Sequence, residues 1–308
     1  MKHQTIRACS IWRALEVVGD VPVLLILDQA FLGKHQFDEF VRETGLARSV
    51  VSNRLQKLVE AGVFVKVPER RGGYSLTDKG HDLFPVALMI LRWQYRWETD
   101  EREFVLGLIH RECGATMVPR AACGHCSAEI DPRHVTWSPG PGLSQITPVY
   151  GRRRLQTIAA TAKRGKRALV DIVFDIFGDR WATLVVRACF TGIHRFDEIQ
   201  RDTLMASNIL ADRLDRLQKN GVIAAKPYSA HQDRFEYRLT EKGRDLYPVL
   251  LALLQWGDKW YADSKGPPLL LTHGDCLQRL QLAPKCSVCD GALNSRNTAF
   301  QFAEPHSS

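Results

Sequence analysis

Histidine and cysteine recur in this sequence in one pattern, H-x2-C-x9-C-x2-C, which occurs twice. The two copies lie 163 positions apart, and the residues in question are His110, Cys113, Cys123 and Cys126, then His273, Cys276, Cys286 and Cys289. Three thiolates and one imidazole form a tetrahedral Cys3His set that suits structural Zn²⁺ and leaves no open position for catalysis. The sequence therefore predicts two structural zinc sites, one formed by each copy.

Two alternatives to zinc remain open: a redox-active dithiol at each C-x2-C pair, and a relict pattern that no longer binds metal. Zinc is favoured because the spacing stayed fixed while the intervening residues changed. The segments around these residues are also small and poor in core residues, so metal would supply folding energy that they lack. His125 and His134 are not candidates, since the second copy has Val288 and Asn297 there.

Composition restricts the class of protein. The chain has 308 residues, 45% of them apolar, with a formal net charge of +8, which favours polyanionic partners such as nucleic acid. No stretch of about 18 apolar residues predicts a membrane span. A cytoplasmic location is expected, where thiols stay reduced; six of the eight cysteines lie in the two motifs, which favours metal over disulfides.

The cysteine pattern belongs to a larger internal duplication. Gly19-Asp20 matches Gly178-Asp179 at a shift of 159, and LTDKG at residues 76–80 matches LTEKG at 239–243 at a shift of 163. Trp93 and Trp97 match Trp256 and Trp260 at this second shift. Because the repeat is far longer than a solenoid unit, it predicts two copies of a whole domain.

Each copy is expected to contain helices, then a short hairpin, then a long helix. In the first copy, apolar residues recur at helical spacing from Leu46 to Val59, and short β-like runs at 63–67 and 74–76 flank the basic turn PERRGG. In the second copy the runs lie at 222–226 and 235–239. The closing helices, from Thr77 and Thr240 to the Trp pairs, are apolar on more than one face, so each needs a packing partner. This order predicts a winged helix-turn-helix.

The predicted fold class is mainly α with short β wings (α+β), each winged helix being followed by a small zinc-ribbon-like Cys3His module. The predicted parts are winged helix 1 at 7–100, module 1 at 105–136, a Pro/Gly-rich then basic linker at 137–167, winged helix 2 at 168–263 and module 2 at 267–302. Two roles are open for the basic run at 151–167: it binds along DNA phosphates, or it is a solvent-exposed linker without a contact to DNA.

Several motifs resemble the HxlR family of bacterial winged-helix transcription regulators. They are CSIWRALEVVGD, the pair FDEF and FDEI, the helices VVSNRLQKLVEAGV and ILADRLDRLQKNGV, the segments YSLTDKG and YRLTEKG, and the closing Trp pairs. The resemblance implies DNA-binding transcriptional control, usually by homodimers whose terminal helices pair. Two such modules in one chain imply an intramolecular pseudo-dimer with two recognition helices, and further homodimerisation remains open.

The recognition helices depart from the Ser-Pro-Arg start that the family often has, and Pro22 stands where members commonly carry a Trp that the second copy keeps as Trp181. The candidate DNA-contacting residues are Arg48, Ser49, Ser52, Asn53, Arg54, Arg70 and Arg71, with Ser207, Asn208, Arg213, His231 and Arg234. Because the two helices differ, we expect an imperfect palindrome as the target. Asp212 and Asp215 would repel phosphates and weaken the second module. An ion pair with nearby acids is the alternative role of Arg54 and Arg213.

The expected function is sequence-specific, double-stranded DNA binding by a nucleoid-associated regulator, with repression as the expected mode. Two alternatives are a protein-interaction scaffold in which one winged helix no longer reads DNA, and a thiol-based redox sensor. Cys9 resembles a family cysteine that senses oxidants or electrophiles in some members, but the second copy has Ala168 there, and a small core residue is the simpler role. The chain shows no P-loop, G-x-S-x-G, H-E-x-x-H or dinucleotide fingerprint, so an enzyme is not expected.

Overall fold

The computed structural model describes residues 5–67, 73–97, 106–147, 173, 176–228 and 235–302. In the first repeat the helices and the hairpin are α1 (Ser10–Val18), α2 (Val21–Phe31), α3 (Phe37–Thr44), α4 (Arg48–Glu60), β2 (Phe64–Val67), β3 (Gly73–Leu76), α5 (Asp78–His81) and α6 (Phe84–Trp97). In the second they are α8 (Arg180–Phe190), α9 (Phe196–Thr203), α10 (Ser207–Lys219), β9 (Ile223–Pro227), β10 (Phe235–Leu239), α11 (Glu241–Arg244) and α12 (Tyr247–Tyr261). Each repeat thus has the predicted order of helices, hairpin and long helix. Among these residues no helix is both long and apolar enough to cross a membrane.

The motif LT-x-KG recurs because it builds the corner between the hairpin and the last helices. The hydroxyl of Thr77 accepts a hydrogen bond from the backbone N–H of Gly80, and Thr240 does the same for Gly243. Such side-chain caps satisfy backbone donors at the start of a helix. A Cβ on Gly80 would lie 2.4 Å from the carbonyl oxygen of Val63, so only glycine fits this close approach.

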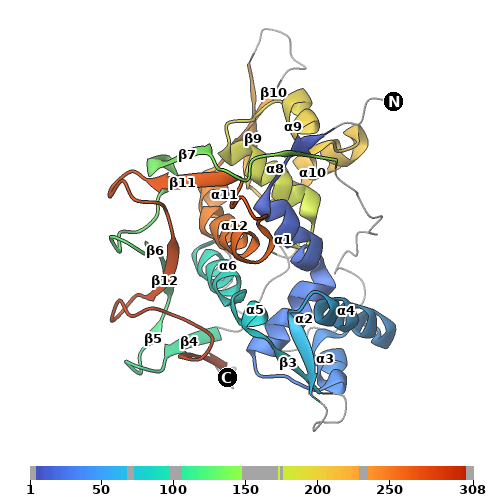
Figure 1. The fold of residues 1–308 in the computed structure, drawn as a ribbon, viewed down its shortest axis with the longest axis vertical. Coiled ribbons are helices and arrows are strands. Elements are labelled where there is room, and N and C mark those ends of the chain that lie inside the picture. Colours follow the sequence, from blue (N-terminus) through green and yellow to red (C-terminus); the bar gives the residue numbers. More distant parts are fainter. Residues whose placement is uncertain are drawn as a thin grey trace, which may run out of the picture.

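The segments after α6 and α12 exchange strands between the repeats. Their strands are β4 (Leu106–His110), β5 (Thr116–Met117), β6 (Pro119–Cys123), β7 (Val135–Pro139), β11 (Leu269–His273), β12 (Leu282–Cys286) and β13 (Thr298–Phe302). The antiparallel pairs β4–β13, β6–β12 and β7–β11 each join one repeat to the other, and β5 adds to β4 within the first repeat. Figure 1 shows these strands on one side of the long helices α6 and α12. The predicted modules are therefore intertwined.

The predicted linker at 137–167 begins inside this ribbon. Trp137 pairs with Leu271 in the β7–β11 ladder, and the backbone N–H of Gly142 donates to the carbonyl of Pro267. The short strand β8 (Gln145–Ile146) then pairs with β1 (Ile6–Arg7). The Pro/Gly-rich part of the predicted linker is thus ordered structure where it is described, and the basic run at 151–167 lies outside the described residues.

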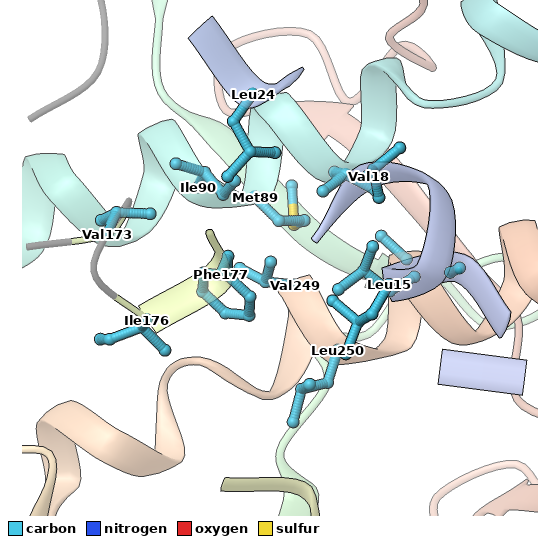
Figure 2. Close-up of a cluster of buried hydrophobic side chains, with 14 of the residues drawn as sticks. Leu15, Val18, Leu24, Met89, Ile90, Val173, Ile176, Phe177, Val249 and Leu250 are labelled. Atoms are coloured by element: carbon cyan, nitrogen blue, oxygen red, sulfur yellow. The ribbon is translucent and has the colours of Figure 1, made fainter. Parts of the chain in front are cut away.

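The main core lies between the repeats. Helix α1 packs along α12, and α12 packs against α6, which gives both long helices the packing partner that their apolar faces require. Figure 2 shows Phe177 of the second repeat near Met89 and Ile90 of the first, with Leu15 near Leu250 on the other side. All five side chains are buried.

The closing Trp pairs anchor each repeat to the other. The indole N–H of Trp93 donates to the carbonyl of Lys242 at 2.9 Å, and that of Trp256 donates to the carbonyl of Lys79 at 2.9 Å. Trp97 and Trp260 donate in the same way to the carboxylates of Asp245 and Asp82. Buried indoles usually need such a partner, and these partners all come from the opposite repeat.

Candidate metal centres and recognition helices

The eight predicted ligands form two clusters, but each cluster draws on both repeats. The first contains His110 and Cys113 with Cys286 and Cys289, and the second contains Cys123 and Cys126 with His273 and Cys276. Our prediction that each copy forms a site by itself was therefore wrong. The reason is the β6–β12 pairing, which carries each C-x2-C pair to the H-x2-C pair of the other repeat.

The distances within each cluster fit a tetrahedral metal ion. In the first, His110 Nδ1 lies 3.4 Å from Cys113 Sγ and 3.2 Å from Cys289 Sγ, and the Sγ atoms of Cys113 and Cys286 are 3.9 Å apart. Zn–S and Zn–N bonds of about 2.3 and 2.0 Å give a tetrahedron with edges of roughly 3.5–3.8 Å. The donor set and its spacing therefore fit zinc.

The second cluster repeats this geometry. His273 Nδ1 lies 3.4 Å from the Sγ atoms of both Cys126 and Cys276, and the Sγ atoms of Cys123 and Cys276 are 4.0 Å apart. Among the described residues all the cysteines are free, so no disulfide competes for these thiols.

Each ligand pair lies on a tight turn, which we call a knuckle. The residue after the second ligand has a left-handed backbone in all four knuckles: Gly114 (φ 70°), Ser127 (φ 62°), Leu277 (φ 57°) and Asp290 (φ 60°). Non-glycine residues adopt this conformation uncommonly, so the surroundings must hold it in place. The turn directs both ligand side chains of a knuckle to the same side.

Backbone donors favour the thiolate form of the two buried cysteines. Burial raises the pKa of Cys286, but the backbone N–H groups of Cys289 and Val288 donate to its sulfur, and the net pKa is lowered. The pKa of Cys123 is lowered in the same way, against its burial, by the N–H groups of Cys126 and His125. Since the thiolate is the form that binds metal, these amides prepare the site.

A carboxylate lies behind each ligand histidine. Nε2 of His110 is 3.6 Å from Glu112, and Nε2 of His273 is 3.5 Å from Asp275; neither contact has the geometry of a hydrogen bond. Metal-bound histidines usually present their second nitrogen to such a group, which fixes the tautomer. Sequence reasoning missed both acids, although each stands two residues after its histidine in the H-x2-C motif.

The recognition-type helices α4 and α10 each present an exposed polar face. Arg48, Ser49, Ser52 and Asn53 are exposed on α4, and Ser207 and Asn208 are exposed on α10. Both helices begin after an alanine N-cap that makes no side-chain hydrogen bond. The first backbone N–H groups therefore remain available, which suits contact with phosphate. Figure 1 shows the two helices in different halves of the molecule.

Arg54 and Arg213 take the alternative role considered above, an ion pair. Arg54 lies 2.8 Å from Asp20, the N-cap of α2, and Arg213 pairs with Asp179, the N-cap of α8. Asp20 and Asp179 also form a β-bridge with each other, so the two pairs meet where the repeats touch. Both arginines fix the recognition helix to its neighbour. Arg70, Arg71, His231 and Arg234 lie outside the described residues.

Comparison with known proteins agrees with this architecture. The model of the HxlR-like helix-turn-helix family matches residues 17–102 and 176–265, together more than half of the chain. The chain is 40% identical over 138 residues to the uncharacterized HTH-type transcriptional regulator Mb3122 of Mycobacterium bovis, which covers 44% of this chain and 87% of that protein.

This chain belongs to the HxlR-like helix-turn-helix family. It is also 33% identical over 91 residues to the uncharacterized HTH-type transcriptional regulator YvaP of Bacillus subtilis, across 29% of this chain and 84% of that protein. The crystal structure of PA1607 matches with 36% identity and a TM-score of 0.37, over 40% of this chain and 87% of that one. The resemblance drawn from the motifs is confirmed, and so is the expectation that the chain is not an enzyme.

The cysteines outside the clusters occupy core positions of this HxlR-like chain. Cys9 is half-buried, precedes α1 and packs against the core. Burial raises the pKa of Cys189 to about 12, and its thiol donates to the carbonyl of Tyr237. A thiol held in its neutral form is a poor nucleophile, so Cys189 acts as a small apolar residue. The role of Cys9 in sensing stays a prediction.

Proposed function

We propose that this protein is a sequence-specific regulator of transcription that binds double-stranded DNA with α4 and α10 of one chain. The observation that carries the proposal is one hydrophobic core shared by the two repeats, each of which presents one recognition-type helix, α4 or α10. The packing of α1 along α12 and the binding of each Trp pair to the opposite repeat support a fixed separation of the two helices. Helix-turn-helix dimers read two half-sites about one helical turn apart in the same way.

The two half-sites of the target are expected to differ. On α4 the exposed face offers Arg48 and Asn53, which can make paired hydrogen bonds to guanine and adenine edges. The matching positions on α10 are Ser207 and Asp212, and the carboxylate would repel phosphates. An imperfect palindrome with one weaker half-site follows from this difference.

The regulator is tested by selecting bound duplexes from a random DNA library with the metal-loaded full chain. The proposal expects an enriched imperfect palindrome, and Arg48→Ala should weaken binding to it by about tenfold through lost base or phosphate contacts. Asp197→Asn, at an exposed position of α9, is a control that should leave affinity nearly unchanged. Salt-sensitive binding to every duplex, with no enriched sequence, would argue against sequence reading.

The two Cys3His clusters are proposed to hold Zn²⁺ as structural ions. With four protein ligands in each cluster, a bound ion would supply tetrahedral coordination and leave no position for a substrate. Because each ligand set spans both repeats, the metal would fix the exchanged strands β6 and β12 to each other. Elemental analysis of the purified chain should find two zinc ions per chain.

Repression is the proposed mode of control, because a protein held on a promoter can exclude polymerase without further contacts. Such a regulator would act in the cytoplasm, on the nucleoid. A scaffold in which α10 meets a protein instead of DNA is the second candidate, and the acids Asp212 and Asp215 are what favour it. If selection returns only one half-site, this second function is supported for the second repeat.

A further inference from the structure

The second repeat contains an open cavity between α12 and β11, here called the α12 cavity. Its volume is ≈ 280 Å³, at the lower limit of the range of about 300–1,000 Å³ that small-molecule sites occupy. Leucines form most of its apolar wall, and its polar groups are Gln255, Asp258, Lys259, Arg279 and Gln281. An apolar wall with a few convergent polar groups is the usual make-up of a ligand site.

The first repeat carries different side chains at the equivalent positions. At the shift of 163, Asp258 corresponds to Tyr95 and Leu280 to Met117. Met117 is buried, and burial raises the pKa of Tyr95 to about 12. Gln255 corresponds to Arg92, whose guanidinium is held by Asp245 and Glu129. The pair Asp258 and Arg279 is therefore particular to the second repeat, since the first repeat has Tyr95 and Thr116 at these positions.

Two opposite charges line the α12 cavity without an ion pair between them. Oδ1 of Asp258 is buried and without a partner among the described residues, whereas the hydroxyl of Ser10 is the neighbouring group that lowers the pKa of this carboxyl by hydrogen bonding. A buried carboxylate oxygen without a donor is unfavourable, so a ligand group that donates here would be stabilised. Arg279 makes no ion pair with a described residue, and Lys259 is already paired with Asp82 at 2.6 Å. Within the described part of the chain, Oδ1 of Asp258 can thus take one further donor, and Arg279 has no carboxylate partner.

We propose that the α12 cavity binds a small zwitterion with an apolar side chain, of the α-amino acid class. Its ammonium group would donate to Asp258, its carboxylate would meet Arg279, and its side chain would lie on Leu251, Leu254 and Leu271. A simple amine fits less well because Arg13 and Arg279 both act on the Asp258 carboxylate and would repel it. A simple carboxylic acid would be repelled by Asp258 itself.

The ligand would join two parts of the protein that the sequence places far apart. Asp258 belongs to α12, which packs on α1 and α6 at the contact between the repeats. Arg279 follows the H-x2-C knuckle of the second cluster and forms a β-bridge with Thr272 of β11. Binding would therefore connect the shared core to the ribbon that carries the metal clusters.

Calorimetric titration of the metal-loaded full chain with L-leucine and L-phenylalanine tests this assignment, with phenethylamine and 3-phenylpropanoate as single-charge probes. We expect saturable binding of at least one amino acid, with one site per chain, and at least tenfold weaker binding of both single-charge probes. Asp258→Asn and Arg279→Gln should each weaken amino acid binding at least tenfold, since each removes a charge-assisted hydrogen bond.

Asp197→Asn makes the same chemical change as Asp258→Asn on an exposed helix face, so it should leave binding unchanged. Thermal unfolding of Asp258→Asn separates a loss of binding from a loss of folding. We expect this variant to be at least as stable as the original chain. The proposal is overturned if neither amino acid binds, if binding survives both cavity variants unchanged, or if a single-charge probe binds as tightly as the amino acids.

Discussion

The exchanged ligand sets make a prediction about pairs of cysteine substitutions. Cys113 and Cys286 belong to one cluster but to different repeats, whereas Cys113 and Cys123 belong to one repeat but to different clusters. The double variant Cys113→Ser/Cys286→Ser should therefore keep one zinc ion per chain. Cys113→Ser/Cys123→Ser should disable both clusters. Sites formed within each copy would give the opposite result for the two variants.

The loss of one cluster also has a calculable effect on stability. A metal that joins Cys113 to Cys286 closes a loop of 173 residues. The second cluster, which joins Cys123 to Cys276, already closes 153 of these. Losing the first cluster alone thus frees a loop of about 20 residues. The chain-entropy relation for a permanent cross-link gives about 3 kcal/mol for such a loop, and the lost free energy of metal binding adds to this minimum.

Zinc content by elemental analysis and unfolding by denaturant give the two readouts of this experiment. The Cys113→Ser/Cys286→Ser variant should lose at least roughly 3 kcal/mol of unfolding free energy. Cys113→Ser/Cys123→Ser should lose more, because the second ion and the long loop that it closes are then lost as well. Cys189→Ser, outside both clusters, is the control for zinc content. A zinc content of one ion in Cys113→Ser/Cys123→Ser and none in Cys113→Ser/Cys286→Ser would refute the exchanged arrangement.

Three further predictions concern single residues. Arg54→Ala should lower the free energy of unfolding by about 2–3 kcal/mol, since it leaves the part-buried Asp20 unpaired, while Arg48→Ala changes DNA affinity with little effect on unfolding. Burial raises the pKa of Asp258, although a hydrogen bond from Ser10 and the charges of Arg279 and Arg13 oppose the rise. The contribution of Asp258 to stability is therefore full below the ordinary value of 3.8 and is lost as pH rises through the raised pKa. Asp258→Asn should remove this part of the pH dependence of unfolding and stabilise the chain at pH 7. Gly80→Ala should destabilise the chain by about 2 kcal/mol or more, because the added Cβ would overlap the carbonyl of Val63. Thermal or denaturant unfolding measures this loss of stability.

The repeated helices and hairpins could be predicted because their signals are local. The apolar spacing within α4 and the cap Thr77 with Gly80 are set by residues a few positions apart. The same local logic predicted all eight cluster residues, because ligand spacing on a turn is a local property. An ion pair of Arg54 with an acid could also be expected from the sequence. That the acid is Asp20 could not, because this contact spans 34 positions.

The exchange of strands could not be predicted from the sequence. The H-x2-C and C-x2-C pairs have the same composition in both repeats, so a cluster built within one copy and a cluster built across two satisfy the same spacing. What decides between them is the packing of α1 along α12 and the β6–β12 pairing, which involve residues more than 150 positions apart. We predicted a linker from Trp137 onward because prolines and glycines are common in flexible linkers. The same residues also occur at the edge of a ribbon, so their composition does not distinguish the two.

The exchange gives the metal clusters a position in the mechanism that independent modules would lack. A cluster within one repeat would stabilise that module alone, and its loss would leave the relation between α4 and α10 unchanged. A cluster across both repeats constrains the ribbon, and the ribbon packs on α6 and α12. Under the proposed pseudo-dimer, the contact between these two helices would set the separation of α4 and α10. Chelation of the metal should then weaken binding to a palindrome more than binding to an isolated half-site, because a half-site requires no fixed separation. Equal loss on both DNAs would mean that the metal supports only the folding of each repeat.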